Sequence, residues 1–377
     1  MAGMISQYMQ RALHIAREAE HIVSPNPIVG AVVVAADGTV AGEGVTQAPP
    51  GPHAEVVALE AAGEKARGGA IYVTLEPCAF HGRTPPCVDA IIAAGVAEVH
   101  FSVSDVDVRT AGKGQAALEA AGIKTVVGEG EEEARRINEA FFKHRTTGLP
   151  FVIAKFASSL DGRIASASGD ARWVSGPESR AWAHQLRTRI DAILVGSETV
   201  IADDPLLTAR PEEEGEDARQ PIRIVLDTRG RTPPMAQVFT GPAPTVIVTS
   251  KDAPAEWRSA IEARGAEVLA LPVADDRIDL RALLEELGRR DVVLLLVEGG
   301  AVVLGSFFDA GFVDKVHAIV APMIVGAAEA PAAVAGRGAY RMADALRLAG
   351  VTVENLGEDL LITGYPQYPD ADADADA

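Results

Sequence analysis

The stretch from His53 to Cys87 decides the fold of the first half of the chain; it reads HAEVVALEAAGEKARGGAIYVTLEPCAFHGRTPPC. Its first ten residues are rich in Ala, Leu and Glu and predict a helix with His53 and Glu55 in the first turn. A strand-like run follows and ends at Leu75, shortly before a Pro. Cys87 begins a second helix. The stretch therefore predicts a helix–strand–helix unit with polar side chains at both connections.

The same stretch predicts a zinc site. His53, Cys78 and Cys87 supply three ligands that zinc prefers and leave the fourth tetrahedral position open for water, as in catalytic sites. The chain has only two Cys, and both fall here, which favours a metal site over ordinary buried thiols beside a surface His. No further Cys or well-placed His completes a closed structural site. Because zinc lowers the pKa of bound water to about 7, the neighbouring Glu55 can shuttle that proton to a leaving amine.

Composition excludes several classes of function. The formal net charge of −19 argues against a nucleic-acid partner, which needs a basic face. No apolar run reaches the roughly 18 residues of a membrane span, and the N-terminus lacks an apolar signal core. Two thiols are too few for a disulfide framework, so we expect a soluble protein in the reducing cytoplasm.

The length of 377 residues and the alternation of strand-like and helix-like segments predict two α/β domains. We expect a zinc-dependent domain over residues 1–147 and a second domain over 148–367. Residues 368–377, which end in DADADADA, should form a disordered acidic tail. Within the first domain we expect a hairpin over 31–42 and one charged helix from Glu129 to Arg145.

The second domain carries one glycine-rich turn. The stretch VEGGAVVLGSF (Val297–Phe307) predicts a strand, a turn and a helix, an arrangement in which backbone N–H groups can approach a phosphate. A tight turn packed against its neighbours explains the glycines equally well. We expect the other strands over 151–157, 192–196, 222–226, 246–249, 268–271, 292–297 and 313–320, with helices over 177–188, 255–264 and 279–288.

Both halves resemble one known family. The H-x-E…P-C…C pattern is similar to that of zinc-dependent nucleobase deaminases, and the long loop PCAFHGRTPPC, with PNPIVG upstream and AGKG downstream, resembles the deaminase half of the bifunctional riboflavin-biosynthesis family. The segments KFASSLDGRIA, RWVSGPESR, HQLR, DAILVGSETVIADDPLLTAR, IRIVLD and VEGGAVVLGSF resemble the reductase half of that family. The resemblance implies an N-terminal cytidine-deaminase-like three-layer α/β domain and a C-terminal dihydrofolate-reductase-like α/β domain.

The resemblance also implies two consecutive reactions on small phosphoribosyl pyrimidines. The first is zinc-dependent hydrolytic deamination of 2,5-diamino-6-(5-phosphoribosylamino)pyrimidin-4-one, with Glu55 as the proton shuttle. The second is reduction of the ribosyl side chain to ribityl, with NADPH as the hydride donor. A homo-oligomer is expected from the family alone.

Site residues follow from the same motifs. Those expected to bind NADPH are Ala157, Trp173, Thr199, Asp203, Thr228, Gly300, Ala301, Val302, Val303, Leu304, Gly305 and Ser306. Those expected to meet the reductase substrate are Ala171, Arg187, Leu207, Arg210 and Glu298, with Lys155 and Ser175 nearby. In the deaminase half, the residues expected to meet substrate are Asn26, His81 and Arg83.

Several of these roles stay open at the level of sequence. Arg187 and Arg210 suit a clamp on a ribose phosphate, although without the motifs they would be taken for solvated surface residues. Asp203 could cap a helix and Trp173 could belong to the core. Asp203 or Glu298 could assist opening of the sugar ring. Asn26, between two prolines, either binds a ligand or forms a turn.

The chain departs from the family pattern at three places. Phe80 stands where a His is common, with His81 next to it; the stretch 105–108 reads DVDV in place of DPNP; and Ala171 stands where Ser is frequent. We expect both activities to survive, with an altered affinity of the deaminase. Two alternatives remain: a deaminase for another nucleobase fused to an orphan reductase, or a zinc-stabilised binding module without catalysis.

Overall fold

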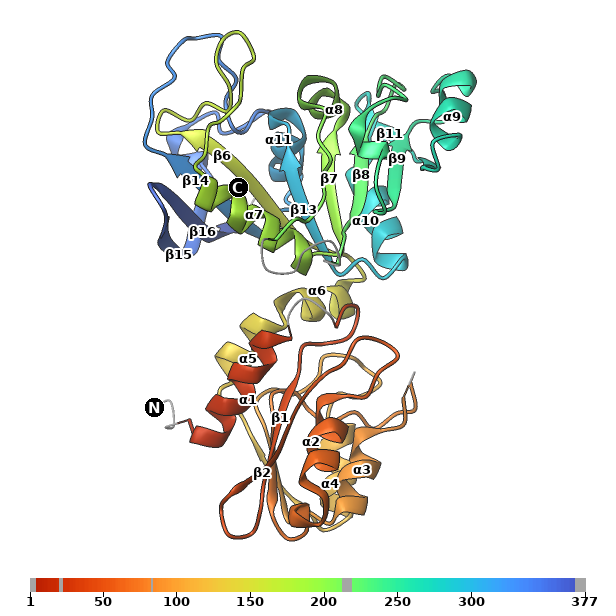
Figure 1. The fold of residues 1–377 in the computed structure, drawn as a ribbon, viewed down its shortest axis with the longest axis vertical. Coiled ribbons are helices and arrows are strands. Elements are labelled where there is room, and N and C mark those ends of the chain that lie inside the picture. The colour runs from red at the N-terminus through yellow and green to blue at the C-terminus, as the bar shows by residue number, and fades with distance from the viewer. Residues whose placement is uncertain (1–4, 20–22, 83, 212–218, 370–377) are drawn as a thin grey trace, which may run out of the picture. The chain divides into compact units, whose positions relative to one another are not determined.

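The structure is a computed structural model, and it describes residues 5–19, 23–82, 84–211 and 219–369 (Figure 1). The chain divides into two compact units, Met1–Leu149 and Pro150–Ala377. Arg83 and the DADADADA end of the predicted tail lie outside the described residues. Among the described residues, no helix is long and apolar enough to cross a membrane.

A five-stranded sheet forms the centre of the first unit. Its strands are β1 (Gly30–Val34), β2 (Val40–Val45), β3 (Ala70–Val73), β4 (Glu98–Phe101) and β5 (Lys124–Val127), in the order β2-β1-β3-β4-β5. Strand β1 pairs antiparallel with β2 and with β3, whereas β3, β4 and β5 run parallel. All five residues of β1 are buried, so the sheet is covered on both faces there.

Helices pack on both faces of this sheet (Figure 1). They are α1 (Gln7–Glu18), α2 (Ala54–Ala62), α3 (Cys87–Ala94), α4 (Lys113–Ala120), α5 (Glu131–Ile137) and α6 (Glu139–Thr147), with a 3-10 turn η1 at Gly63–Ala66. A Cβ at Gly30 would lie 2.1 Å from the backbone of α1, and one at Gly44 would lie 2.4 Å from the backbone of α2. Glycines thus let one helix approach each face, which confirms the predicted three-layer domain.

The single charged helix predicted from Glu129 to Arg145 is wrong: the segment forms α5 and α6, which meet at Asn138. The buried Asn138 side chain accepts a hydrogen bond from the N–H of Ile28 and donates one to the carbonyl of Ile28, each over 2.8 Å. An Asn side chain adds nothing to a helix interior. At this position Asn138 supplies hydrogen-bond partners for the backbone N–H and C=O groups of Ile28 in the loop before β1.

The second unit is built on a nine-stranded sheet. Its strands are β6 (Phe151–Ser159), β7 (Ala192–Gly196), β8 (Ile222–Leu226), β9 (Thr245–Thr249), β10 (Glu267–Ala270), β13 (Leu294–Gly299), β14 (Lys315–Ala321), β15 (Arg347–Leu356) and β16 (Asp359–Gln367). The order is β10-β9-β8-β7-β13-β6-β14-β16-β15. All pairs from β10 to β14 are parallel, and β16 and β15 add two antiparallel strands. A separate hairpin consists of β11 (Val273–Ala274) and β12 (Arg277–Ile278).

Helices connect these strands: α7 (Pro177–Arg189), α8 (Ser197–Asp203), α9 (Ala255–Glu262), α10 (Leu280–Arg289) and α11 (Ala301–Asp309), with 3-10 turns η3 (Gln237–Phe239) and η4 (Met342–Asp344). Helix α7 crosses in front of the sheet in the view of Figure 1. The described part of the chain thus contains the predicted parallel α/β arrangement, together with α8, β15 and β16, which the sequence did not predict.

Candidate functional site

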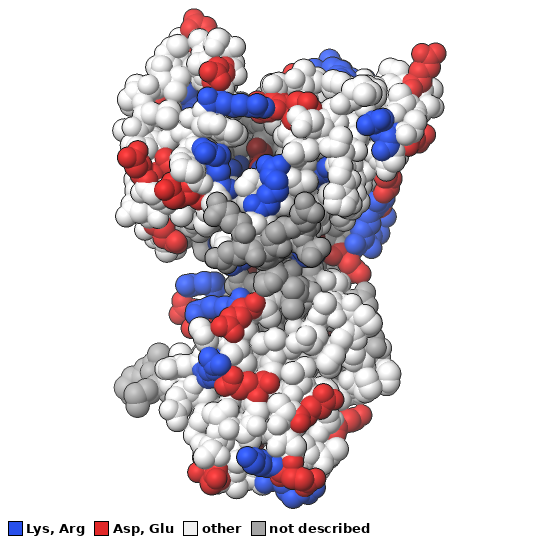
Figure 2. All heavy atoms as spheres, in the orientation of Figure 1, with Lys and Arg blue, Asp and Glu red and all other residues white. Residues whose placement is uncertain are grey.

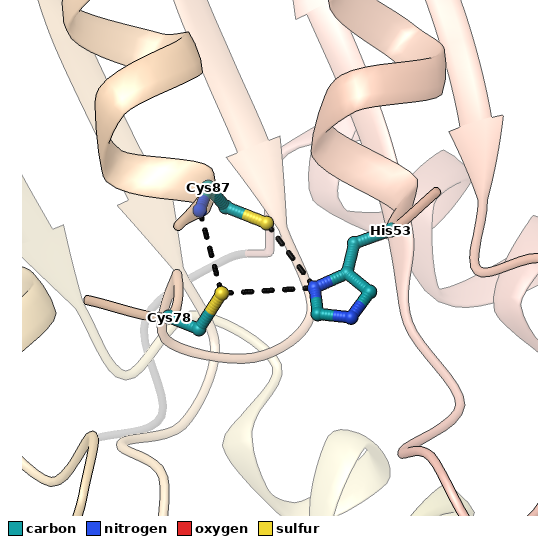
Figure 3. Close-up of side chains that lie close together, drawn as sticks. All are labelled: His53, Cys78 and Cys87. Atoms are coloured by element: carbon teal, nitrogen blue, oxygen red, sulfur yellow. Dashed lines mark hydrogen bonds between the residues drawn. The ribbon is translucent and has the colours of Figure 1, made fainter. Parts of the chain in front are cut away.

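The three predicted zinc ligands meet at one point (Figure 3). His53 Nδ1 lies 3.3 Å from Cys87 Sγ and 3.6 Å from Cys78 Sγ, and all three ligand atoms lie within 4.8 Å of one another. Tetrahedral zinc, with Zn–S of about 2.3 Å and Zn–N of about 2.0 Å, places N and S ligands roughly 3.5 Å apart. The observed spacing therefore fits a zinc ion.

The backbone around the ligands explains why they converge. His53 is the N-cap of α2, whose first turn lies against β2 at Gly44, and Cys87 is the first residue of α3. The Cys87 N–H donates a hydrogen bond to Cys78 Sγ over 3.3 Å, so the loop after β3 is held at the start of α3. On the far side of the imidazole, Thr84 Oγ1 lies 3.4 Å from His53 Nε2. Nδ1 faces the sulfurs and is the nitrogen that would bind zinc, so Nε2 would carry the proton and donate a hydrogen bond to Thr84 Oγ1, an orienting contact that sequence reasoning missed.

Electrostatics at this site favour metal binding and proton transfer. The hydrogen bond from Cys87, together with His53, lowers the pKa of Cys78, while the same contact and burial raise the pKa of Cys87, so Cys78 is the more acidic of the two thiols. Glu55 is only 4% exposed, and burial, assisted by the charge of Cys78, raises its pKa to about 7. A carboxyl group with such a pKa can both accept and donate a proton at neutral pH.

A second buried carboxylate, Glu76, joins two loops of the first unit. It accepts hydrogen bonds from the backbone N–H groups of Asp105, Gly112 and Gln115 over 3.2, 3.1 and 3.2 Å. Close by, a Cβ at Gly114 would lie 2.1 Å from the Pro77 carbonyl oxygen. The loop that starts at Asp105 is therefore fixed against the loop that carries Cys78.

Two of the three departures from the family pattern, Phe80 and the DVDV stretch, are connected through Arg109. The Arg109 guanidinium lies over the Phe80 ring at 4.4 Å, and its Nε contacts both carboxylate oxygens of Asp107 at 2.9 and 3.1 Å. Of the other predicted deaminase contacts, Asn26 is half-buried in a turn before β1, and His81 is exposed. Their contacts with substrate stay predictions.

In the second unit, a row of polar side chains crosses four neighbouring strands. Lys155 of β6 is aligned with His317 of β14, and His317 is aligned with Thr363 of β16. His317 Nδ1 lies 2.9 Å from Thr363 Oγ1. Glu298 of β13 follows Val297, which is aligned with Ala154, so Glu298 lies beside Lys155. The predicted substrate residues Lys155 and Glu298 thus share one face of the sheet.

Helix α7 adds Arg187 to this row. Its Nη2 and Nε bind the two carboxylate oxygens of Glu298 over 2.7 and 3.2 Å, and both side chains are largely buried. Burial opposes ionisation of Glu298, but Arg187 and Lys155 outweigh it and lower the pKa of Glu298 to about 2. Burial also lowers the pKa of Lys155, although Glu298 opposes that effect. Figure 2 shows this unit hollowed on the face drawn, with basic side chains at the rim.

Some of the predicted NADPH contacts lie around the turn between β13 and α11. A Cβ at Gly300 would lie 3.1 Å from Thr199 Oγ1, and one at Gly196 would lie 2.9 Å from the Val303 side chain, so α8 and α11 begin side by side. Gly305 and Ser306 face elsewhere: a Cβ at Gly305 would overlap Ala335, and Ser306 Oγ accepts a hydrogen bond from Arg277.

The remaining predicted residues border this region. The Asp203 carbonyl accepts a hydrogen bond from Arg172 over 2.8 Å, which ties α8 to the segment before Trp173. Trp173 is 65% exposed, so it is not a core residue. Leu207 is buried, whereas Ala157, Ala171 and Ser175 are half-buried, and Thr228 lies in the turn after β8. These positions are compatible with ligand contacts, which stay predictions.

Two family models match the chain: the cytidine and deoxycytidylate deaminase zinc-binding region over residues 4–103, and the RibD C-terminal domain over residues 150–362. The riboflavin biosynthesis protein RibD of Aquifex aeolicus is 42% identical over 358 residues, which cover 94% of this chain and 96% of the relative. The chain belongs to the RibD family. The RibD of Escherichia coli is 39% identical, over 94% of this chain and 97% of the relative.

Solved structures agree. Acinetobacter baumannii RibD superimposes with a TM-score of 0.87 at 36% identity, covering 96% of this chain and 98% of that one. A Thermotoga maritima diaminohydroxyphosphoribosylaminopyrimidine deaminase/5-amino-6-(5-phosphoribosylamino)uracil reductase superimposes with a TM-score of 0.82 at 33% identity and the same coverage.

The family, the fold class and the two activities predicted from the sequence are thereby confirmed. The chain is a RibD enzyme of riboflavin biosynthesis, with a zinc-binding deaminase domain and a reductase domain of a family that uses NADPH. The alternative of a binding module without catalysis is wrong.

Proposed function

We propose that the chain deaminates 2,5-diamino-6-(5-phosphoribosylamino)pyrimidin-4-one and then reduces the ribosyl side chain of the product, giving 5-amino-6-(5-phosphoribitylamino)uracil. The observation that carries this proposal is the convergence of His53, Cys78 and Cys87 beside a buried Glu55, in one chain with a buried charged row around Lys155. The Thermotoga maritima relative is named for the substrates of both steps.

In the deaminase, His53, Cys78 and Cys87 would hold zinc, which when bound supplies a Lewis acid that makes water a nucleophile at neutral pH. Glu55 accepts the proton of the attacking water, and its pKa of about 7 lets it hold that proton until the C–N bond breaks. It then protonates the leaving amine, which departs as ammonia. Glu55 is 4% exposed, which limits its contact with bulk water.

In the reductase, bound NADPH would supply the hydride that reduces C1′ of the opened sugar. Glu298 is ionised and bound to Arg187, so its part is to orient groups rather than to deliver a proton. Asp203, whose pKa is raised by burial, is the better proton carrier of the two acids considered for ring opening. Lys155, which lies beside Glu298 on the neighbouring strand, would bind an oxygen of the substrate. Arg187 and Arg210 would hold the phosphate.

We also propose that the enzyme forms a homo-oligomer in the cytoplasm. The outermost strand of the second sheet, β15, is ten residues long and largely exposed, with Val351 51% and Val353 59% exposed. A long apolar edge strand is normally covered, and a second copy of this chain could cover it. The zinc ligands include two free thiols, which a reducing compartment preserves.

The test is NADPH oxidation by the zinc-loaded enzyme, given either the diaminopyrimidine nucleotide or its deaminated product. We expect both to support oxidation, and we expect Glu55→Gln to abolish it only for the first. If only the deaminated product supports oxidation by the wild-type enzyme, the deaminase substrate is wrong. If neither does, the substrate proposed for each half is wrong.

A further inference from the structure

His184 is a residue of the second unit to which no role has been assigned. It lies on α7, one turn before Arg187, and is half-buried. Its Nδ1 lies 3.2 Å from the carbonyl oxygen of Thr208, and its Nε2 lies 3.3 Å from Nη2 of Arg210. The same Thr208 carbonyl accepts a hydrogen bond from Arg187 over 3.1 Å. His184 therefore connects the two arginines of the proposed phosphate clamp.

The two contacts fix the protonation of the imidazole. A carbonyl oxygen can only accept, so Nδ1 carries a proton and donates to Thr208. An arginine can only donate, so Nε2 must be the unprotonated nitrogen that accepts from Arg210. Both bonds exist together only in the neutral Nδ1–H tautomer. If Nε2 were protonated, its N–H would face an N–H of Arg210, and the hydrogen bond that holds Arg210 would be lost.

The surroundings keep His184 in that form. Burial, followed by the charges of Arg187 and Arg210, lowers its pKa to about 4, while Thr208 and the charge of Glu298 act in the opposite direction. At neutral pH the imidazole is thus an acceptor for Arg210. The backbone beside Arg210 is fixed as well, because Gln220 binds both the N–H and the carbonyl of Ala209 over 2.9 Å.

We propose that His184 is a positioning residue that, as a neutral imidazole, holds the Arg210 guanidinium at the place where the phosphate of the reductase substrate binds. The inference rests on the proposed function, because it needs Arg210 to meet that phosphate. His184 acts through Arg210 and takes no part in hydride transfer. It contributes to the affinity for phosphorylated substrate and sets the spacing of the two guanidinium groups.

The test measures reductase kinetics with the deaminated nucleotide and with the same compound lacking its phosphate. For His184→Phe we expect KM of the phosphorylated substrate to rise by about tenfold, because one charge-assisted hydrogen bond is lost. We expect kcat, KM for NADPH and the constants of the phosphate-free compound to stay unchanged. His184→Gln, whose amide offers an acceptor and a donor, should restore part of the affinity and serves if the Phe variant does not fold. His14→Phe, at an exposed His of the first unit, is the control.

A double-mutant cycle with Arg210→Gln separates the possible outcomes. If His184 acts through Arg210, the double variant has the KM of Arg210→Gln alone. Additive effects, or an equal loss with the phosphate-free compound, overturn the positioning role but leave the phosphate clamp intact. If Arg210→Gln itself leaves KM unchanged, the clamp of the proposed function is wrong and the role of His184 falls with it.

Discussion

Replacing Glu298 by Gln should destabilise the second unit strongly, because it leaves Arg187 as a buried cation without its partner. The two side chains are 9% and 14% exposed and are joined by hydrogen bonds of 2.7 and 3.2 Å. Lys155, on the neighbouring strand, would lose the same compensating charge. Removing one member of such a buried pair costs about 3–5 kcal/mol, so we expect the free energy of unfolding to fall by that amount.

The chain offers a matched control. Glu267 binds Arg290 through two contacts of 2.8 Å, but these side chains are 48% and 32% exposed. Glu267→Gln should therefore cost less than about 1 kcal/mol. Urea unfolding can be followed by tryptophan fluorescence, since Trp173, Trp182 and Trp257 all belong to the second unit. Equal losses for the two variants, or a loss below about 1 kcal/mol for Glu298→Gln, would refute the reasoning.

Further predictions concern both active sites. Glu55→Gln should slow ammonia release by about 10²–10⁴-fold, with zinc content and oxidation of NADPH by the deaminated substrate unchanged. Thr84→Val should weaken zinc binding by about 10–100-fold in a chelator competition, because His53 Nε2 loses its partner. Arg109→Leu should raise the deaminase KM several-fold and leave reductase constants unchanged; an unchanged KM would exclude a role of this loop in substrate binding. The pKa of Glu298 is about 2, below its ordinary value of 4.5, so its contribution to stability is complete above pH 4.5 and is lost toward pH 2. In Glu298→Gln, the free energy of unfolding measured in urea should depend less on pH between about 4.5 and 2.

Sequence analysis predicted best the helices and strands that are determined by residues close together in the sequence. Strands β7 and β8 and helix α3 occupy the predicted residues, because each is a largely apolar segment that can be recognised from its own sequence. The break at Asn138 was missed because its partner, Ile28, lies 110 residues away. Strand β15 was missed because it is largely exposed and lacks a continuous apolar pattern.

The site shows the same division. The zinc ligands could be predicted, since imidazole and thiolate side chains such as those of His53 and the two cysteines are common zinc ligands. Contacts made by backbone groups could not be predicted, as with Glu76, whose partners are three backbone N–H groups that lie 29 to 39 residues further along the chain. The role of His184 could not be predicted either, because it depends on the Thr208 carbonyl and the Arg210 guanidinium, which lie beside its two ring nitrogens only in the folded chain.

The DVDV stretch shows how a structure can change the reading of a charge. In the sequence, a second Asp at 107 suggests repulsion of a substrate phosphate. In the structure, Arg109 binds Asp107, lowers its pKa and rests on Phe80, the residue that stands where the family pattern has His. The Asp105 carboxylate accepts a hydrogen bond from the Asp107 N–H over 2.9 Å, and burial raises the pKa of Asp105 to about 6. Because one acidic charge is balanced and the other is used to hold the loop, the repulsion is smaller than composition indicates. Phe80 and Asp107 are therefore connected through Arg109, so a substitution at either position changes the contacts of Arg109.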